Sequence, residues 1–130
     1  MKPGADTDDP VSDTERQLFE HLQMLLQHEY LYRDPEITID KVALRLKINK
    51  TYLSRAINHC TGNNFNALIN EYRVKEAVLL MSDASQKFSF EGLAFEVGFN
   101  NRRTFYNAFC KITGISPSVF INNLQKNGVD

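Results

Sequence analysis

The sequence predicts an all-α fold of about seven helices, and three observations carry this prediction. Apolar residues recur three and four positions apart along most of the chain, which is the period of a helix with one buried face. Ser, Thr, Asn or Asp precedes most of these stretches and Gly follows several of them, as at helix starts and ends. No segment of useful length alternates apolar with polar residues, as a half-buried strand would.

Composition restricts the class of protein. The chain has 130 residues, 42% of them hydrophobic, and so can bury a core without disulfide or metal staples. Cys60 and Cys110 fall inside predicted helices and are interpreted as small buried thiols, which favours a reducing compartment. No apolar run approaches the ~20 residues that span a bilayer, and the N-terminus has no signal-peptide pattern. We therefore expect a cytoplasmic protein with no membrane contact by this segment.

The first helix follows residues 1–12, which are rich in Asp, Pro and Gly and are expected to form a flexible acidic tail or linker. Asp13 or Thr14 is predicted as its N-cap. It should end before Arg33-Asp34-Pro35, because a residue that precedes proline is pushed out of the helical region. Its apolar positions are Leu18, Phe19, Leu22, Leu25 and Leu26.

Two shorter helices follow. Thr38 precedes the first, Lys47-Ile48 forms a tight break, and Asn49 is the N-cap of the second. Gly62 stands where a helix C-terminus favours glycine. The buried positions are predicted to be Val42, Ala43, Leu46, Leu53, Ile57 and Cys60.

The remaining helices show the same signals. Asn64 opens a long helix that fades at Ser82-Asp83, and Ser89 caps a short one. Gly98 makes a turn, Asn100 or Asn101 starts the next helix, and Gly114 ends it. Ser116-Pro117 starts the last helix, as an N-cap followed by proline at the first helical position. Their apolar positions are predicted to be Leu93, Ala94, Val97, Phe105, Phe109, Ile112, Phe120, Ile121 and Leu124.

The most informative feature is an internal repeat. Residues 42–49 match residues 93–100 at an offset of 51, and beyond the turn the match resumes at an offset of 52, up to Thr61-Gly62 and Thr113-Gly114. Each repeat is a short helix, a tight turn and a longer helix, which is the helix-turn-helix layout. The turn requires a positive φ, which Gly98 supplies freely and which Lys47 adopts at a cost of about 1 kcal/mol.

The second repeat carries a specific pattern, VGF…F…F…TG-x-SP, at Val97-Gly98-Phe99, Phe105 and Phe109–Pro117. Together with Tyr52–Arg55 and Asn70–Val74, it resembles the DNA-binding domain of the AraC/XylS transcription regulators over about residues 16–126. The chain departs from that family's pattern in two places, where Lys47 replaces the usual glycine and where Phe88-Ser89-Phe90 replaces the commoner helix entry.

The resemblance implies a bacterial transcription regulator with two helix-turn-helix subdomains, residues 13–63 and 83–127, joined by a linker helix over residues 64–82. Each subdomain would present its second helix, about residues 49–61 and 101–113, to the major groove of one duplex. Two such insertions one turn apart are ~34 Å, or about 10 base pairs, from centre to centre.

Helical geometry and residue chemistry select the candidate contacts. Arg pairs with guanine in a bidentate manner and Asn with adenine, whereas phosphate contacts position the protein without reading sequence. The Arg102-Arg103 pair opposes the macrodipole at a helix start, which favours an anionic partner. Taken singly, an exposed Arg or Asn is more often simply solvated. The predicted base contacts are Thr51, Ser54, Arg55, Arg102, Arg103 and Asn107. The predicted phosphate contacts are Lys41, Lys50, Tyr52, Tyr106, Lys111 and Ser116.

The net charge of −1 is unusual for a DNA-binding protein, but the charge is unevenly distributed. Residues 1–35 hold eight acids and three bases, whereas residues 36–126 hold twelve bases and seven acids, a net of +5. An acidic leader thus masks a basic globular part.

Other site classes have no support in the sequence. His21 and His28 are separated by two helical turns, ~10 Å, which is too far for one metal ion. No nucleophile–base arrangement or phosphate-binding glycine loop occurs, so we expect neither an enzyme nor a cofactor.

The expected partners are double-stranded DNA, RNA polymerase, and an upstream sensor or dimerisation domain of which this chain would be the C-terminal output. The alternative is a helical protein-interaction module that has lost DNA binding. The basic charge and the arginines on both presented helices favour DNA.

Overall fold

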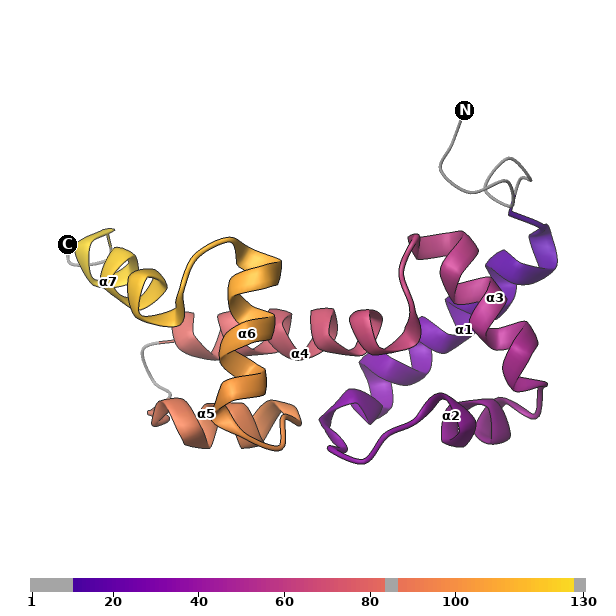
Figure 1. Ribbon diagram of the computed structural model, residues 1–130, viewed down its shortest axis with the longest axis horizontal. Coiled ribbons are helices and arrows are strands. Elements are labelled where there is room, and N and C mark those ends of the chain that lie inside the picture. Colours follow the sequence, from indigo (N-terminus) through magenta and orange to yellow (C-terminus); the bar gives the residue numbers. More distant parts are fainter. Residues whose placement is uncertain (1–10, 84–86, 128–130) are drawn as a thin grey trace. The chain divides into compact units, whose positions relative to one another are not determined.

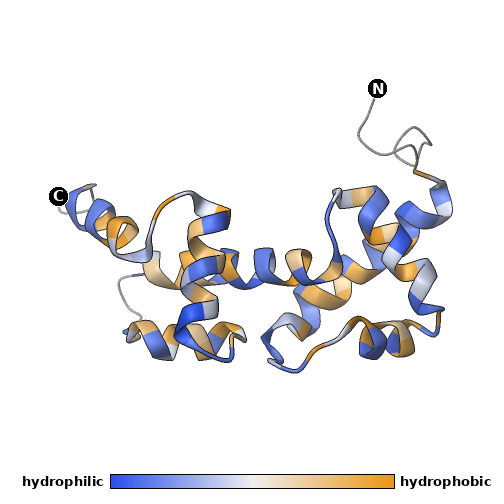
Figure 2. Ribbon diagram, viewed as in Figure 1, coloured by the Kyte–Doolittle hydropathy of each residue, from blue (hydrophilic) through white to orange (hydrophobic). Residues whose placement is uncertain are grey.

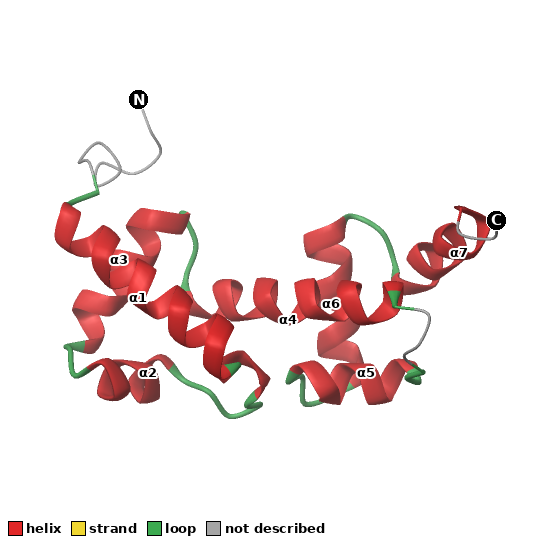
Figure 3. Cartoon of the chain, turned by 180° about the vertical axis from the view of Figure 1, so that it is seen from behind, coloured by secondary structure: helices red, strands yellow, loops and turns green. Residues whose placement is uncertain are grey.

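A computed structural model describes residues 11–83 and 87–127 of the chain. These residues form seven α-helices and one 3-10 turn, and within these two ranges there is no strand (Figure 3). The predicted all-α fold is confirmed. The acidic tail predicted over residues 1–12 lies outside the described residues, apart from its last two positions.

The elements follow one another in the predicted order (Figure 1). They are α1 (Asp13–Glu29), the 3-10 turn η2 (Leu31–Arg33), α2 (Ile39–Leu46), α3 (Lys50–Thr61), α4 (Phe65–Ser82), α5 (Phe90–Val97), α6 (Arg102–Thr113) and α7 (Pro117–Asn127).

The described chain divides into two compact units. The first unit comprises residues 11–31 and 36–68, and the second comprises residues 32–35 and 69–127. α4 begins in the first unit and continues into the second, and residues 32–35, which include the last two residues of η2, belong to the second unit.

Local capping sets most helix boundaries. Thr38 and Ser89 accept hydrogen bonds from backbone N–H groups in the first turns of α2 and α5, as predicted. Asn101 rather than Asn100 caps α6. The prediction for α1 was wrong, because its N-cap is Ser12. Ser12 and Glu15 form a reciprocal capping box, which satisfies two backbone N–H groups where a lone Asp13 or Thr14 cap would satisfy fewer.

The core of the first unit is built from apolar residues on α1, α2, α3 and the start of α4, and α3 packs against both α1 and α2. The fully buried residues include Leu22, Leu26, Val42, Leu53, Ala56 and Ile57. Cys60, which was predicted to be buried, is only half-buried, as is Cys110 in the second unit.

The core of the second unit is aromatic. Phe105 lies at its centre, with ring centroids 4.9 Å from Phe90, 5.2 Å from Phe99 and 5.9 Å from Phe109. Figure 2 shows the corresponding apolar stretches of α5 and α6 in orange, interrupted by hydrophilic residues in blue.

Two predicted core positions, Ile112 and Ile121, are 40% and 38% exposed. Ile112 points along the same side of α6 as Phe105, but it lies in the last turn, beyond the aromatic cluster. Helical direction alone therefore overestimates its burial.

A buried arginine ties η2 and the following segment to the rest of the second unit. Arg73 on α4 is 9% exposed and donates from Nε to the Tyr32 carbonyl at 2.7 Å and from Nη2 to the Asp34 carbonyl at 3.0 Å. Its guanidinium also lies 5.3 Å from the centroid of the Phe99 ring, in the turn before α6. Burial lowers the pKa of Arg73, but an arginine remains charged at any physiological pH.

A second arginine reinforces this segment. Arg33 donates from Nε to Glu76 on α4 at 2.9 Å and forms an ion pair with the same carboxylate. The Tyr32 ring packs on Tyr72 with centroids 5.6 Å apart, and burial together with Glu76 raises the pKa of Tyr32 to about 12. The segment 32–35 is thus an integral support of the turn that leads into α6.

Candidate nucleic-acid interface

α3 is positioned by a tight turn and a strong N-cap. Lys47 adopts a left-handed conformation with φ 60°, and the N–H of Ile48 bonds to the Ala43 carbonyl at 3.0 Å. The Asn49 side chain accepts from the N–H groups of Thr51 and Tyr52 at 2.7 and 3.2 Å. The apolar side of α3 faces α1 and α2, so the polar side of this helix is directed away from the core.

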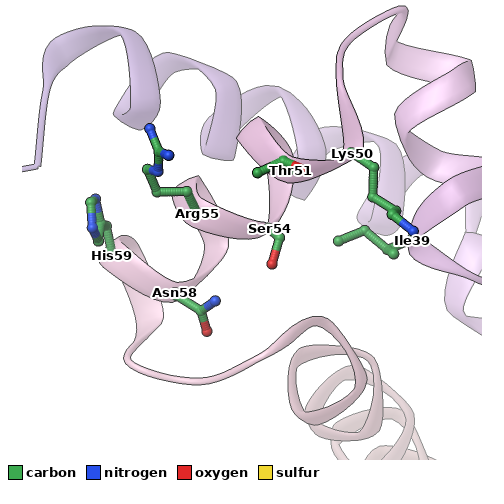
Figure 4. Close-up of a pocket in the computed structure, with 7 residues that line it drawn as sticks. All are labelled: Ile39, Lys50, Thr51, Ser54, Arg55, Asn58 and His59. Carbon is green, nitrogen blue, oxygen red and sulfur yellow. The ribbon is translucent and has the colours of Figure 1, made fainter. Parts of the chain in front are cut away.

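The polar side of α3 borders a hollow of about 430 Å³ (Figure 4). Three of the predicted base contacts, Thr51, Ser54 and Arg55, line it together. The predicted phosphate contact Lys50 also lines it, and Ile39 at the start of α2 closes one side. The remaining lining residues, Asn58 and His59, were not among the predicted contacts. The sequence could have indicated Asn58 as a contact, because this residue follows Ser54 by four positions on the outward side of α3.

The basic residues near this hollow have weak intramolecular partners. Lys50 Nζ lies 3.2 Å from Asp40 Oδ1, and Lys41 Nζ donates to the Glu36 carbonyl at 2.9 Å. Both contacts are exposed to solvent, where the Lys50–Asp40 ion pair contributes about 0–1 kcal/mol and the Lys41 hydrogen bond competes with water. Either lysine can therefore exchange its present partner for a phosphate at little cost. Tyr52, another predicted phosphate contact, is half-buried on α3.

A buried hydrogen bond links α3 to α1. Glu15 Oε1 lies 3.0 Å from His59 Nδ1, and the two side chains are 8% and 15% exposed. The hydrogen bond from His59 lowers the pKa of Glu15, against the opposing effect of burial. Burial also raises the pKa of the adjacent Cys60 thiol, so this thiol is not an activated one. Sequence spacing could not reveal the pair, because its members are 44 residues apart.

α6 is the counterpart of α3 in the second unit. Asn101 Oδ1 accepts from the Thr104 N–H at 2.8 Å, and Phe105, Ala108 and Phe109 form the buried side. The predicted contacts Arg102, Arg103, Asn107 and Lys111 are all exposed. Arg103, Asn107 and Lys111 follow one another at spacings of four and so form one stripe along α6.

The other predicted contacts of the second unit have distinct surroundings. The Arg102 guanidinium lies 5.8 Å from the centroid of the Phe90 ring, a cation–π contact that holds it near the start of α6. Tyr106 is 46% exposed on the same helix. Ser116 Oγ accepts from the Val119 N–H at 3.2 Å and therefore caps α7. Neither α3 nor α6 contains an Asp or Glu, so both polar faces carry only neutral or basic side chains.

Within residues 11–83 and 87–127, no three His, Cys, Asp or Glu residues are grouped so that they could hold a metal ion. No helix in this part of the chain is both long and apolar enough to cross a membrane.

Comparison with known proteins identifies the family to which this chain belongs. A family model described as a helix-turn-helix domain matches residues 42–123, which is more than half of the chain and includes both repeats. The chain belongs to the AraC-type helix-turn-helix family. The family is that of the DNA-binding domains of AraC-type transcription regulators, and the resemblance noted in the sequence is confirmed. Domains of this family are typically non-enzymatic.

Individual relatives agree with this assignment. The AraC-type chain is 33% identical over 87 residues to an uncharacterized HTH-type transcriptional regulator in the cgkA 5' region of Pseudoalteromonas carrageenovora, over 65% of this chain. Its fold matches the C-terminal domain of AraT, a response regulator from Geobacillus stearothermophilus, with a TM-score of 0.68, 26% identity and 88% of each chain covered. It also matches the fold of the AdpA DNA-binding domain, solved in complex with a target DNA, with a TM-score of 0.70 and 19% identity over 84% of this chain and 93% of that one.

The AraC-type relatives are longer proteins. This chain spans 49%, 11% and 32% of the lengths of the three curated relatives that it matches. The matched region is thus a part of each of those regulators.

Proposed function

We propose that this chain recognises a bipartite DNA site, with α3 reading one half and α6 the other half in successive major grooves. The observation that carries the proposal is the equivalence of the two helices. Each follows a left-handed turn residue, is capped by Asn, buries three residues and presents an acid-free polar side. Major-groove insertions one helical turn apart predict half-site centres ~34 Å, or about 10 base pairs, apart.

Residue chemistry assigns the roles within each half. Arg55 and Arg103 are proposed guanine readers, because a guanidinium donates in a bidentate manner to guanine O6 and N7. Asn107 is a proposed adenine reader. Arg102 is a third arginine proposed to contact a base. Its guanidinium either leaves the Phe90 ring when DNA binds or contacts the base while it stays against this ring. Since the two polar faces differ in sequence, the two half-sites should also differ.

The flanking residues are proposed to hold the DNA backbone. Lys50 and Lys41 would contact phosphates of the first half-site, and Lys111 and Tyr106 would contact phosphates of the second. Tyr52 and Ser116 remain proposed phosphate contacts, although Ser116 also has a capping role.

The proposed architecture is the C-terminal output module of a larger bacterial, cytoplasmic regulator. It comprises helix-turn-helix subdomains over residues 13–63 and 83–127 and a linker helix over residues 64–82. An upstream domain would sense a signal and dimerise. The greater length of the curated relatives supports this arrangement, as does the match to the C-terminal domain of a response regulator.

The test is a selection of random duplexes with the purified chain, followed by anisotropy titrations of the enriched duplexes at several salt concentrations. The expected result is a motif with two unlike halves about 10 base pairs apart and an affinity that falls steeply with salt. A single half-site would contradict the bipartite model. Absence of enrichment, both for this chain and for a version fused to a dimerising coiled coil, would contradict sequence-specific reading.

A second candidate function, binding of a protein partner such as RNA polymerase, is favoured by two exposed apolar residues. Leu44 on α2 is 79% exposed and Phe95 on α5 is 54% exposed, and they occupy equivalent positions of the two repeats. If they contact a protein, L44E and F95E should reduce transcription activation or partner binding while leaving the DNA affinity unchanged. An equal loss of DNA affinity would contradict a separate protein surface.

A further inference from the structure

The Glu15–His59 pair lies at the edge of the surface proposed to read DNA. Glu15 is fixed in place, because its carboxylate accepts both from His59 Nδ1 at 3.0 Å and from the Ser12 N–H at 3.4 Å. The side chain of His59 in turn lines the same hollow as Thr51 and Arg55 (Figure 4). A buried carboxylate thus orients an imidazole toward a surface of basic and neutral groups.

The ring nitrogens of His59 have different roles. With Nδ1 engaged by Glu15, the other nitrogen, Nε2, has no hydrogen-bond partner in the part of the chain that the structure describes. A neutral imidazole that donates from Nδ1 presents Nε2 as an acceptor, whereas an imidazolium presents Nε2–H as a donor. Only the protonated form can therefore bond to a phosphate oxygen.

Two features of the fold surround the imidazole of His59. The Glu15 carboxylate lies against Nδ1, and His59 stands in the last turn of α3. The other charged or titratable groups in this region are Arg55 and Cys60 on α3 and Arg16 on α1; Arg16 itself pairs with Asp13 at 3.4 Å.

We propose that His59 is a further DNA contact of the first unit, donating from Nε2 to a backbone phosphate oxygen in its protonated form. The proposal rests on α3 being a DNA-reading helix. His59 follows Arg55 by four residues, about 6 Å along the helix axis. It is therefore placed at the C-terminal end of the reading surface, where a recognition helix leaves the groove and meets the backbone. Glu15 acts as a positioning residue for this contact.

The experiment measures affinity for the selected duplex between pH 5.5 and 8, the range in which histidine titrates. The wild-type affinity should fall several-fold as the pH rises. H59Q, which keeps a hydrogen-bonding side chain but no charge, should remove this dependence and reduce the salt slope at pH 6 by about 1. H21Q, which changes an exposed histidine on α1, should behave as the wild type. E15Q, which removes the charge of the residue that positions His59, should reduce the affinity at pH 6 and leave the affinity at pH 8 unchanged.

Several outcomes would overturn the proposal. They are a wild-type pH dependence in H59Q, an unchanged salt slope in H59Q, and the same loss of dependence in H21Q. If H59Q does not fold, calorimetry of the wild type in two buffers of different protonation enthalpy measures the same event. Net proton uptake on binding near pH 7 is expected, and none would overturn the contact. Failure of the proposed function itself looks different, since no duplex would then be enriched at any pH.

Discussion

The turn into α6 provides a sharp test of how the second unit is held together. Gly98 has a φ of +112°, and a Cβ added there would lie 2.4 Å from the Tyr32 carbonyl oxygen and 2.8 Å from Arg73 Nε. It would also lie 2.9 Å from the Cα of Arg33. Two of these three neighbours are backbone atoms, which cannot move aside as a flexible side chain can. We therefore predict that Gly98→Ala is severely destabilising.

The size of the effect follows from two contributions. A positive φ costs a residue with a Cβ about 1–2 kcal/mol. Overpacking against immobile atoms costs about 1–3 kcal/mol more. Displacement of Arg73 would add to this loss, because its hydrogen bond to Tyr32 is buried.

Gly114 is the matched control. It has a φ of +84° at the end of α6, but an added Cβ would meet nothing within 4 Å. Gly114→Ala should therefore cost only the backbone strain, about 1–2 kcal/mol. The gain from a less flexible unfolded chain is the same for both substitutions and cancels in the comparison.

The measurement is urea unfolding followed by circular dichroism for the wild type and both variants. Gly98→Ala should be less stable than Gly114→Ala by at least about 1–3 kcal/mol, because overpacking and the displacement of Arg73 affect only Gly98→Ala. Equal losses in the two variants would show that the close approach of residues 32–35 to this turn does not contribute to stability, and the reasoning would be wrong.

Three further predictions concern other sites. Lys47→Gly should raise the stability by roughly 0.5 kcal/mol, because relief of left-handed strain at φ 60° outweighs the added freedom of the unfolded chain; a lower unfolding midpoint would contradict this. Arg103→Ala should weaken binding to the specific duplex by about 1–3 kcal/mol and relax preference at one base pair, whereas Lys111→Ala should weaken binding to all duplexes alike; a uniform loss in both would refute the assignment of roles. Because the pKa of Glu15 is lowered on folding, its contribution to stability is present above the pKa of an unfolded glutamate and is lost as the pH falls through the lowered value. The stability difference between wild type and E15Q in thermal unfolding should therefore be largest near neutral pH and shrink below about pH 4.5, and a constant difference would contradict the linkage.

Features encoded by neighbouring residues could be predicted from the sequence. The caps Thr38, Asn49 and Ser89, and the positive φ of Lys47 and Gly98, depend on interactions within a few residues. The repeat then identified the fold, because two matched helix-turn-helix patterns in register restrict the topology. One local signal was misread, since Ser12 and Glu15 already form a capping-box sequence ahead of α1.

The interface was partly predictable for the same reason. A buried stripe on α3 or α6 determines which side chains remain outward, so Thr51, Arg55 and Arg103 could be selected from helical geometry. Geometry could not show that Lys50 already pairs with Asp40 or that Arg102 lies over Phe90, because these partners belong to other helices.

The tertiary structure decided what depends on residues far apart in the chain. The sequence by itself determined the helices, their caps and turns, and which side of each recognition helix faces outward, because these follow from contacts between near neighbours. Only the folded chain placed Tyr32 and Asp34 on Arg73, and His59 on Glu15, across separations of 39 to 44 residues. It likewise left Ile112 exposed, since burial requires a neighbouring element to cover a residue as well as a correct direction on the helix. No periodicity encodes such contacts, because they arise from the packing of one helix on another.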